Sequence, residues 1–179
     1  MIHGGVYPIA TDFRAGVAYS MAAIKGTLTM EQLVRIWFPA AVPEDLETAQ
    51  TAVNAFFRCG EPAGKQTDTQ RTPDYAFGAD AAAIVAAFQR EYGIDLTTQR
   101  LHWWRFNALL RGLLSHSFSE RVRYRVADPE SIKSTELRKE YRKYKELYAL
   151  GTDGEPVERP DTLEAYDDWL KRVARGETR

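Results

Sequence analysis

Apolar residues recur at three- and four-residue steps along most of this chain, the spacing that places side chains on one face of an α-helix. Residues 11–26 give a clear example, with apolar side chains at Phe13, Val17, Met21 and Ile24. Asp12 precedes this run as a helix-capping residue, and Gly26 follows it as a helix-ending residue. The pattern predicts a first helix over this segment.

Further helices are predicted by similar signals. Thr29 begins the sequence TMEQ, a capping-box pattern, and Pro43 suits the first position of a third helix. Apolar periodicity predicts the remaining helices at about 79–92, 98–114, 119–125 and 136–148, and a last one after Asp161 with Leu163, Tyr166, Leu170 and Val173 on one face.

The segment LHWWRFNALLRGLL, Leu101–Leu114, is apolar on nearly all sides of a helix. A helix of this kind belongs in the interior of a bundle, where several neighbours contact it. Trp104 is therefore expected to be interior. The residues predicted to form the structural core, here and on the basic helix, are Leu101, Trp103, Trp104, Phe106, Leu109, Leu110, Leu113, Tyr141, Tyr144 and Tyr148.

The pattern contains no β-hairpin signature, no internal repeat and no long coiled-coil run. We therefore predict an all-α protein, a compact helical bundle of about six to seven helices around a central apolar helix at about 98–114. The helical domain is expected over 1–150, with a mobile loop at 60–73 that is rich in Gly, Pro and Thr. An acidic C-terminal extension with one amphipathic helix is expected over 151–179.

Composition and charge place the chain among ordinary globular proteins. Of its 179 residues, 44% are hydrophobic and 27% charged, and the formal net charge is −1. The positive charge is concentrated in residues 97–150, with twelve Lys/Arg against six Asp/Glu. No secretory signal and no apolar run of the roughly 18 residues that a membrane span needs can be found. We expect a cytosolic protein with no membrane partner.

Signals for catalysis and for cofactors are missing from the sequence. His3, His102 and His116 are scattered, and Cys59 has no CxxC partner, so no metal site is predicted. There is no phosphate-binding glycine motif and no GxSxG sequence. The chain is therefore predicted to be no enzyme and to bind no cofactor.

Binding to another macromolecule is the remaining class of function. Tyrosines among Lys and Arg in the helix 136–148 resemble a single-strand nucleic-acid platform, but the tyrosines keep core spacing and the sequence pI is about 6.3. Nucleic acid is therefore the less favoured alternative. The candidate partner-binding residues, chosen as aromatic side chains that the core does not all need and as cations of the basic helix, are Trp37, Phe57, Arg138, Arg142, Lys145 and Trp169.

Four motifs in order resemble one known family. They are YPIATDFR near the start, YAFGADAAAIVAAFQREYGIDL, LHWWRFNALLRGL, and the closing pattern of SIK and RKEYRKYKELYAL. Over about residues 5–150 the chain is similar to the bacteriophage "gene product fifteen" family of siphophage tail-module proteins. The 60–73 segment and the tail 151–179 have no counterpart in the family pattern.

The resemblance implies a function through gene position. Members resemble tail assembly chaperones, which coat the long tape-measure protein and bring tail-tube subunits to it. It implies a non-enzymatic protein in the cytoplasm of an infected or lysogenic bacterium, with the tape-measure and tail-tube proteins as partners. A structural connector or tail completion protein of the virion is the alternative, and a homo-oligomer stays open.

Overall fold

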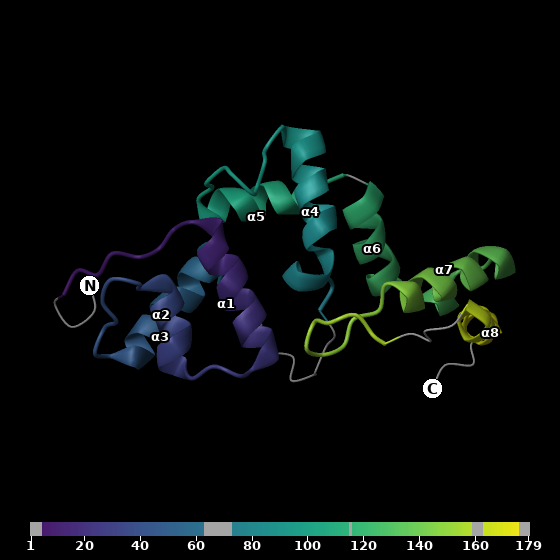
Figure 1. Cartoon of the computed structure of the whole chain (residues 1–179), viewed down its shortest axis with the longest axis horizontal. Coiled ribbons are helices and arrows are strands. Elements are labelled where there is room, and N and C mark those ends of the chain that lie inside the picture. The colour runs from purple at the N-terminus through teal and green to yellow at the C-terminus, as the bar shows by residue number, and fades with distance from the viewer. Residues whose placement is uncertain (1–4, 63–72, 115, 159–162, 176–179) are drawn as a thin grey trace. The chain divides into compact units, whose positions relative to one another are not determined.

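The computed structural model describes residues 5–62, 73–114, 116–158 and 163–175. These residues form eight α-helices, one short 3-10 helix and no β-strand, which confirms the all-α class and adds to the six to seven helices expected. In chain order the elements are α1 (Phe13–Lys25), α2 (Met30–Trp37), α3 (Leu46–Phe57), α4 (Phe77–Tyr92), α5 (Trp103–Arg111), α6 (His116–Val126), η1 (Pro129–Ser131), α7 (Thr135–Leu147) and α8 (Leu163–Arg175) (Figure 1).

Side-chain caps begin the first two helices where the sequence predicts them. Asp12 caps α1 by accepting a hydrogen bond from the Arg14 backbone N–H, and Thr29 forms both halves of a capping box with Gln32. The predicted start of the third helix at Pro43 is wrong. Asp45 is the capping residue there, because its carboxylate accepts from the Thr48 N–H, so α3 begins at Leu46.

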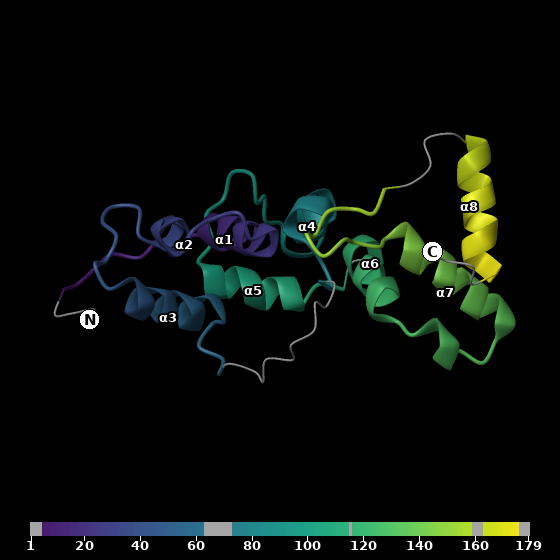
Figure 2. The ribbon, with the colours of Figure 1, turned by 90° about the horizontal axis from the view of Figure 1, so that it is seen from below.

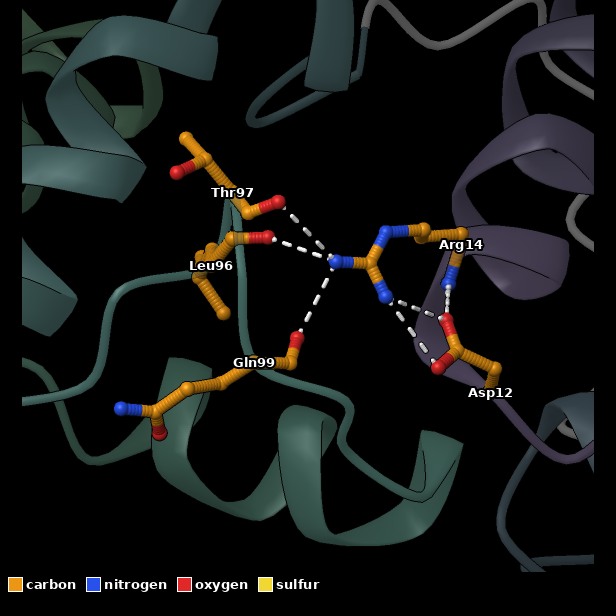
Figure 3. Close-up of polar contacts among 5 residues, drawn as sticks. All are labelled: Asp12, Arg14, Leu96, Thr97 and Gln99. Atoms are coloured by element: carbon orange, nitrogen blue, oxygen red, sulfur yellow. Dashed lines mark hydrogen bonds and ion pairs between the residues drawn. The ribbon is translucent and has the colours of Figure 1, made fainter.

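The apolar helix α5 is shorter than the predicted 98–114, because the preceding residues fold into a turn. Asp95 accepts hydrogen bonds from the backbone and side chain of Thr97. Arg14 then holds the turn from outside: its Nη2 donates to the carbonyls of Leu96 (3.1 Å), Thr97 (3.5 Å) and Gln99 (3.1 Å) (Figure 3). Carbonyls that bind a guanidinium are not available for a helix ladder, so α5 begins only after His102.

The described residues fall into two compact units. The first is formed by 1–71 with 84–113, and the second by 72–83 with 114–179, so the division lies within α4. This division does not coincide with the predicted helical domain at 1–150 and extension at 151–179. Of the predicted loop 60–73, residues 63–72 lie outside the described residues, as does the predicted cap Asp161.

The first unit packs α1, α2, α3, α5 and the second part of α4 around aromatic rings. Figure 2 shows α1 and α2 on one side of this unit and α3 and α5 on the other. Trp37 and Trp103 are both fully or nearly fully buried and meet edge to face, with ring centroids 6.2 Å apart. Phe106 stacks between Phe13 and Phe88. Stacked and edge-to-face aromatic rings therefore lie at the centre of this unit, among buried aliphatic side chains.

The second unit contains α6, η1, α7 and α8. Tyr124 of α6 contacts three tyrosines of α7 and its end, Tyr141, Tyr144 and Tyr148, with centroids 4.9, 4.7 and 6.2 Å away. Those three were predicted to be core and are half-buried. The helix α8 packs on α7. The amphipathic helix expected in the C-terminal extension is thus present and belongs to this unit.

Candidate protein-binding surface

The tryptophan pair at the start of α5 is hydrogen-bonded to the end of α3. The Nε1–H of Trp103 donates to the carbonyl of Phe57 at 2.8 Å, and the Nε1–H of Trp104 donates to the carbonyl of Phe56 at 2.9 Å. Carbonyls in the last turn of a helix lack partners in the regular helix ladder. The Phe56 carbonyl also accepts from the Cys59 backbone N–H at 2.9 Å, so the two indoles add side-chain donors at this helix end. The two adjacent tryptophans therefore donate to two adjacent carbonyls at the end of α3.

The two rings nevertheless end in different environments. Trp103 points into the core, 2% exposed, and stacks on Phe57 at 5.0 Å. Trp104 is 43% exposed. The expectation that Trp104 is interior is therefore wrong: neighbours on a helix point about 100° apart, and the outer of the two faces away from the core. The other predicted core residues of this segment, Leu101, Phe106, Leu110 and Leu113, are buried, and Leu109 is half-buried.

Trp104 belongs to a group of three rings, which we call the 104 patch: Phe56, His102 and Trp104. The ring centroids lie 5.6 Å apart for Phe56 and Trp104, 5.6 Å for Phe56 and His102, and 6.0 Å for His102 and Trp104. The Nδ1 of His102 accepts from the Trp104 backbone N–H at 3.2 Å. Hydrogen bonds and ring contacts therefore hold the exposed indole in place.

Charged groups border the 104 patch. Arg111 lies two turns along α5 on the same face as Trp104, and its Nη1 is 2.6 Å from the Glu61 carboxylate. A hydrogen bond from that guanidinium lowers the pKa of Glu61. Burial raises the pKa of the Cys59 thiol nearby, so the thiol stays protonated at neutral pH. The patch is thus an apolar centre beside an ion pair, a composition typical of protein-binding surfaces.

The predicted partner-binding aromatics lie elsewhere. Trp37 is 0% exposed and packs among Tyr19, Phe56, Phe57 and Trp103, so its proposal as a surface anchor is wrong. Phe57 is half-buried under Trp103, and Trp169 is half-buried on α8. Trp37 is therefore part of the core of the first unit, and Phe57 lies at its margin.

The three predicted cations of α7 are bound to the segment before that helix. Arg138 donates to the carbonyl of Ile132, Lys145 donates to the carbonyl of Ala127, and Arg142 pairs with Glu130. All three cations are half-buried. These contacts hold η1 and its neighbours on α7. Of the three cations, Arg142 is the one paired with a carboxylate here, whereas Arg138 and Lys145 bind neutral carbonyls and keep their positive charge.

A buried ion pair in the second unit has no counterpart in the sequence analysis. Asp80 is 0% exposed, and its two carboxylate oxygens lie 2.6 and 3.0 Å from the guanidinium of Arg125. The same guanidinium donates to the Tyr148 carbonyl at 2.5 Å. The pair ties the start of α4 to α6 and to the end of α7. Asp80 stands among alanines in the sequence, and nothing there signals its burial.

Among the described residues, no group of three or more His, Cys, Asp or Glu side chains could hold a metal ion. Within the same part of the chain, no helix is both long and apolar enough to cross a membrane. Among the described residues, the 104 patch combines an exposed tryptophan ring with a hydrogen bond that fixes it.

A comparison with protein families decides the relationship of the chain. The family described as bacteriophage Gp15 protein matches residues 1–150. The chain belongs to this family. The resemblance drawn from the ordered motifs is thereby confirmed, and the Gp15 match includes α1 to α7 but not α8. No curated protein and no solved structure matches the chain. The Gp15 assignment supports a phage structural or assembly protein in general.

Proposed function

We propose that this Gp15-family chain is a non-enzymatic tail assembly chaperone. It binds the tape-measure protein, keeps it from aggregating in the cytoplasm of the infected or lysogenic host, and helps to recruit tail-tube subunits. The observation that carries the proposal is the 104 patch: a tryptophan 43% exposed and held by a hydrogen bond, on a chain of a phage family.

The physical properties of the 104 patch suit reversible protein binding. Tryptophan is the residue most enriched among binding hot spots, and it supplies a large apolar area together with one polar group. Here the indole N–H already has its partner in the Phe56 carbonyl, so burial of the ring under a partner leaves no donor unsatisfied. The fixed ring also loses little conformational entropy on binding.

The tape-measure protein is the proposed partner because a long helical client needs a chaperone with exposed apolar anchors. An amphipathic helix presents apolar side chains at i, i+3, i+4 and i+7, and such a stripe can cover an aromatic patch. The structural connector remains the competing function. It differs from a chaperone in one respect that can be measured, because a connector stays in the finished particle.

Co-expression with the neighbouring tape-measure protein tests the proposal. We expect the client to become soluble and to co-purify with this chain, and we expect mass spectrometry of purified particles to find the client without the chaperone. A client that stays insoluble with no complex would reject the proposal. Detection of this chain in particles at a fixed ratio to the tail proteins would favour the connector.

A further inference from the structure

The start of α5 lies along the residues that lead into α1, and backbone hydrogen bonds join the two segments. The Phe13 N–H donates to the carbonyl of Leu101 at 2.9 Å, and the Trp103 N–H donates to the carbonyl of Thr11 at 2.7 Å. This is the pattern of an isolated antiparallel bridge. The entry into α1 therefore helps to position the backbone from which α5 begins.

The turn before α5 satisfies its N–H groups from within, but its carbonyls depend on another element. The carboxylate of Asp95 accepts from the Thr97 N–H, and the carbonyl of Asp95 accepts from the Gln99 N–H, both at 2.8 Å. The carbonyls of Leu96, Thr97 and Gln99 converge instead on Nη2 of Arg14 (Figure 3). Within the described part of the chain, these three carbonyls therefore take their hydrogen bonds from a single side chain.

A guanidinium suits this place better than a neutral donor does. Three carbonyl oxygens within 3.5 Å of one nitrogen present the negative ends of their dipoles to it, and a positive charge strengthens each bond. The other arm of the guanidinium, Nη1 of Arg14, lies 3.1 and 3.2 Å from the two carboxylate oxygens of Asp12, which caps α1. The planar fork of arginine thus bridges a helix cap and a turn, which a point-like ammonium does less well.

Arg14 is also linked to α5 through an aromatic stack. Its guanidinium lies over the ring of Phe13, 4.8 Å from the centroid, and Phe13 stacks on Phe106 of α5 with centroids 4.7 Å apart. The Arg14 side chain is 44% exposed, so water competes for each of its polar contacts. We therefore expect the loss of this side chain to loosen the start of α5 locally rather than to unfold the chain.

The 104 patch begins directly after the turn that Arg14 binds. Gln99 and Trp104 are five residues apart, and between them His102 caps α5 by accepting the Trp104 N–H at 3.2 Å. We propose that Arg14 is a positioning residue of the 104 patch: its guanidinium fixes the turn, and the turn fixes the end of α5 that carries His102 and Trp104. This inference rests on the proposed function, which makes the patch the binding place of the client.

Amide hydrogen exchange measures the hold of Arg14 on this segment in the absence of a client. Arg14→Met keeps an unbranched side chain but removes the donors and the charge. The control Arg35→Met removes a guanidinium that is paired with Glu31 on α2. We expect the N–H groups of Gln99 and Trp104 to exchange at least about tenfold faster in Arg14→Met and to stay within about twofold of the parent in Arg35→Met.

Two exchange results would overturn the proposal. One is unchanged exchange at the start of α5 in Arg14→Met. The other is an equal acceleration of the α3 amides, because that would show a general loss of stability instead of a local one.

Arg14→Lys tests whether the positive charge holds the turn. An ammonium can donate to the carbonyls but does not reproduce the fork that also binds Asp12. We expect Arg14→Lys to recover at least about half of the protection that Arg14→Met loses, because bonds from a charged donor are the stronger ones. Exchange in Arg14→Lys as fast as in Arg14→Met would overturn the role assigned to the charge.

A double-mutant cycle shows whether Arg14 acts on the client through Trp104. We expect Arg14→Met to weaken binding of the tape-measure protein at least about fivefold in the parent chain but less than about twofold in Trp104→Ala, where the positioned ring is absent. Arg35→Met should leave the affinity unchanged in both backgrounds. An equal loss from Arg14→Met with and without the Trp104 ring would overturn the proposal, since the effect would then not pass through that ring.

The two kinds of measurement separate this inference from the proposed function. If the parent and Arg14→Met bind the tape-measure protein equally well, the positioning role fails and the chaperone function stands. If the parent does not bind the tape-measure protein, the chaperone function fails, and the exchange rates alone decide whether Arg14 holds the 104 patch.

Discussion

Gly16, the fourth residue of α1, leaves room for the ring of Trp103, and Gly16→Ala tests the aromatic core. An added Cβ would lie 2.1 Å from Trp103 Cε3 and 2.4 Å from Cδ2 and Cζ3, far inside ordinary van der Waals contact. The ring cannot easily retreat. Its N–H is bonded to Phe57, its faces stack near Phe57 and Phe106, and it is 2% exposed.

The expected magnitude is the balance of two effects. Overpacking a filled core costs about 1–3 kcal/mol, and the fixed ring favours the upper part of that range. Alanine gains roughly 0.5–1 kcal/mol over glycine within a helix. We therefore expect Gly16→Ala to lower the free energy of unfolding by about 1–2 kcal/mol, seen as a lower denaturation midpoint in urea with an unchanged slope.

Two comparisons connect this loss to the ring. Gly78→Ala places the same substitution at an exposed position of α4 and should leave stability unchanged or raise it. In a Trp103→Leu background, where the ring is gone, the cost of Gly16→Ala should largely disappear. A Gly16→Ala protein as stable as its parent would refute the close packing of α1 on the indole.

Three further results are expected. Trp103→Ala should cost about 3–5 kcal/mol of stability, and Trp104→Ala only about 1–2 kcal/mol, since it loses one hydrogen bond and a ring already partly in water; equal losses in urea unfolding would contradict the different burial of the two rings. Asp80→Ala should cost about 3–5 kcal/mol by leaving the Arg125 guanidinium buried without its acid, and Arg125→Met added to it should restore part of the loss; an undisturbed thermal transition for Asp80→Ala would count against the pair. Because burial raises the pKa of Cys59, its thiolate fraction at pH 8 is lower than that of a free thiol. Iodoacetamide should therefore react more slowly with the folded chain than with the chain in urea, and the rate should rise with pH through a midpoint above the ordinary thiol pKa. Equal reaction rates in the two states would contradict this.

The sequence predicted the helices well where local signals act alone. Asp12 and Thr29 cap helices because a short oxygen-bearing side chain reaches backbone N–H groups two or three residues on, which is a local property. Period and caps together predicted α1, α2, α4 and α7 to within about two residues. The predicted start of α3 at Pro43 was wrong because two local signals for a helix start lie close together. The Asp45 carboxylate accepts a hydrogen bond from the Thr48 N–H, so the helix begins after Asp45.

The candidate surface depended on tertiary contacts that periodicity does not report. Trp37, a candidate surface anchor, is buried, and Trp104, expected to be interior, is exposed. A helical wheel orders the faces of one helix but does not say which face meets another helix. The length of α5 was set by Arg14, more than 80 residues away in sequence from the carbonyls it holds. Asp80 is buried because Arg125 meets it in space. Such pairings follow from the assembled fold.

The affinity of Trp104→Ala for the tape-measure protein tests the central claim most directly. Val126→Ala is a suitable control, because Val126 is 50% exposed and lies outside the 104 patch. With purified proteins and isothermal calorimetry, removal of a hot-spot tryptophan should weaken binding by at least about thirtyfold, or roughly 2 kcal/mol, while the control stays within about twofold of the parent. Parent-like affinity of a folded Trp104→Ala chain would contradict the claim that this ring is the anchor for the client.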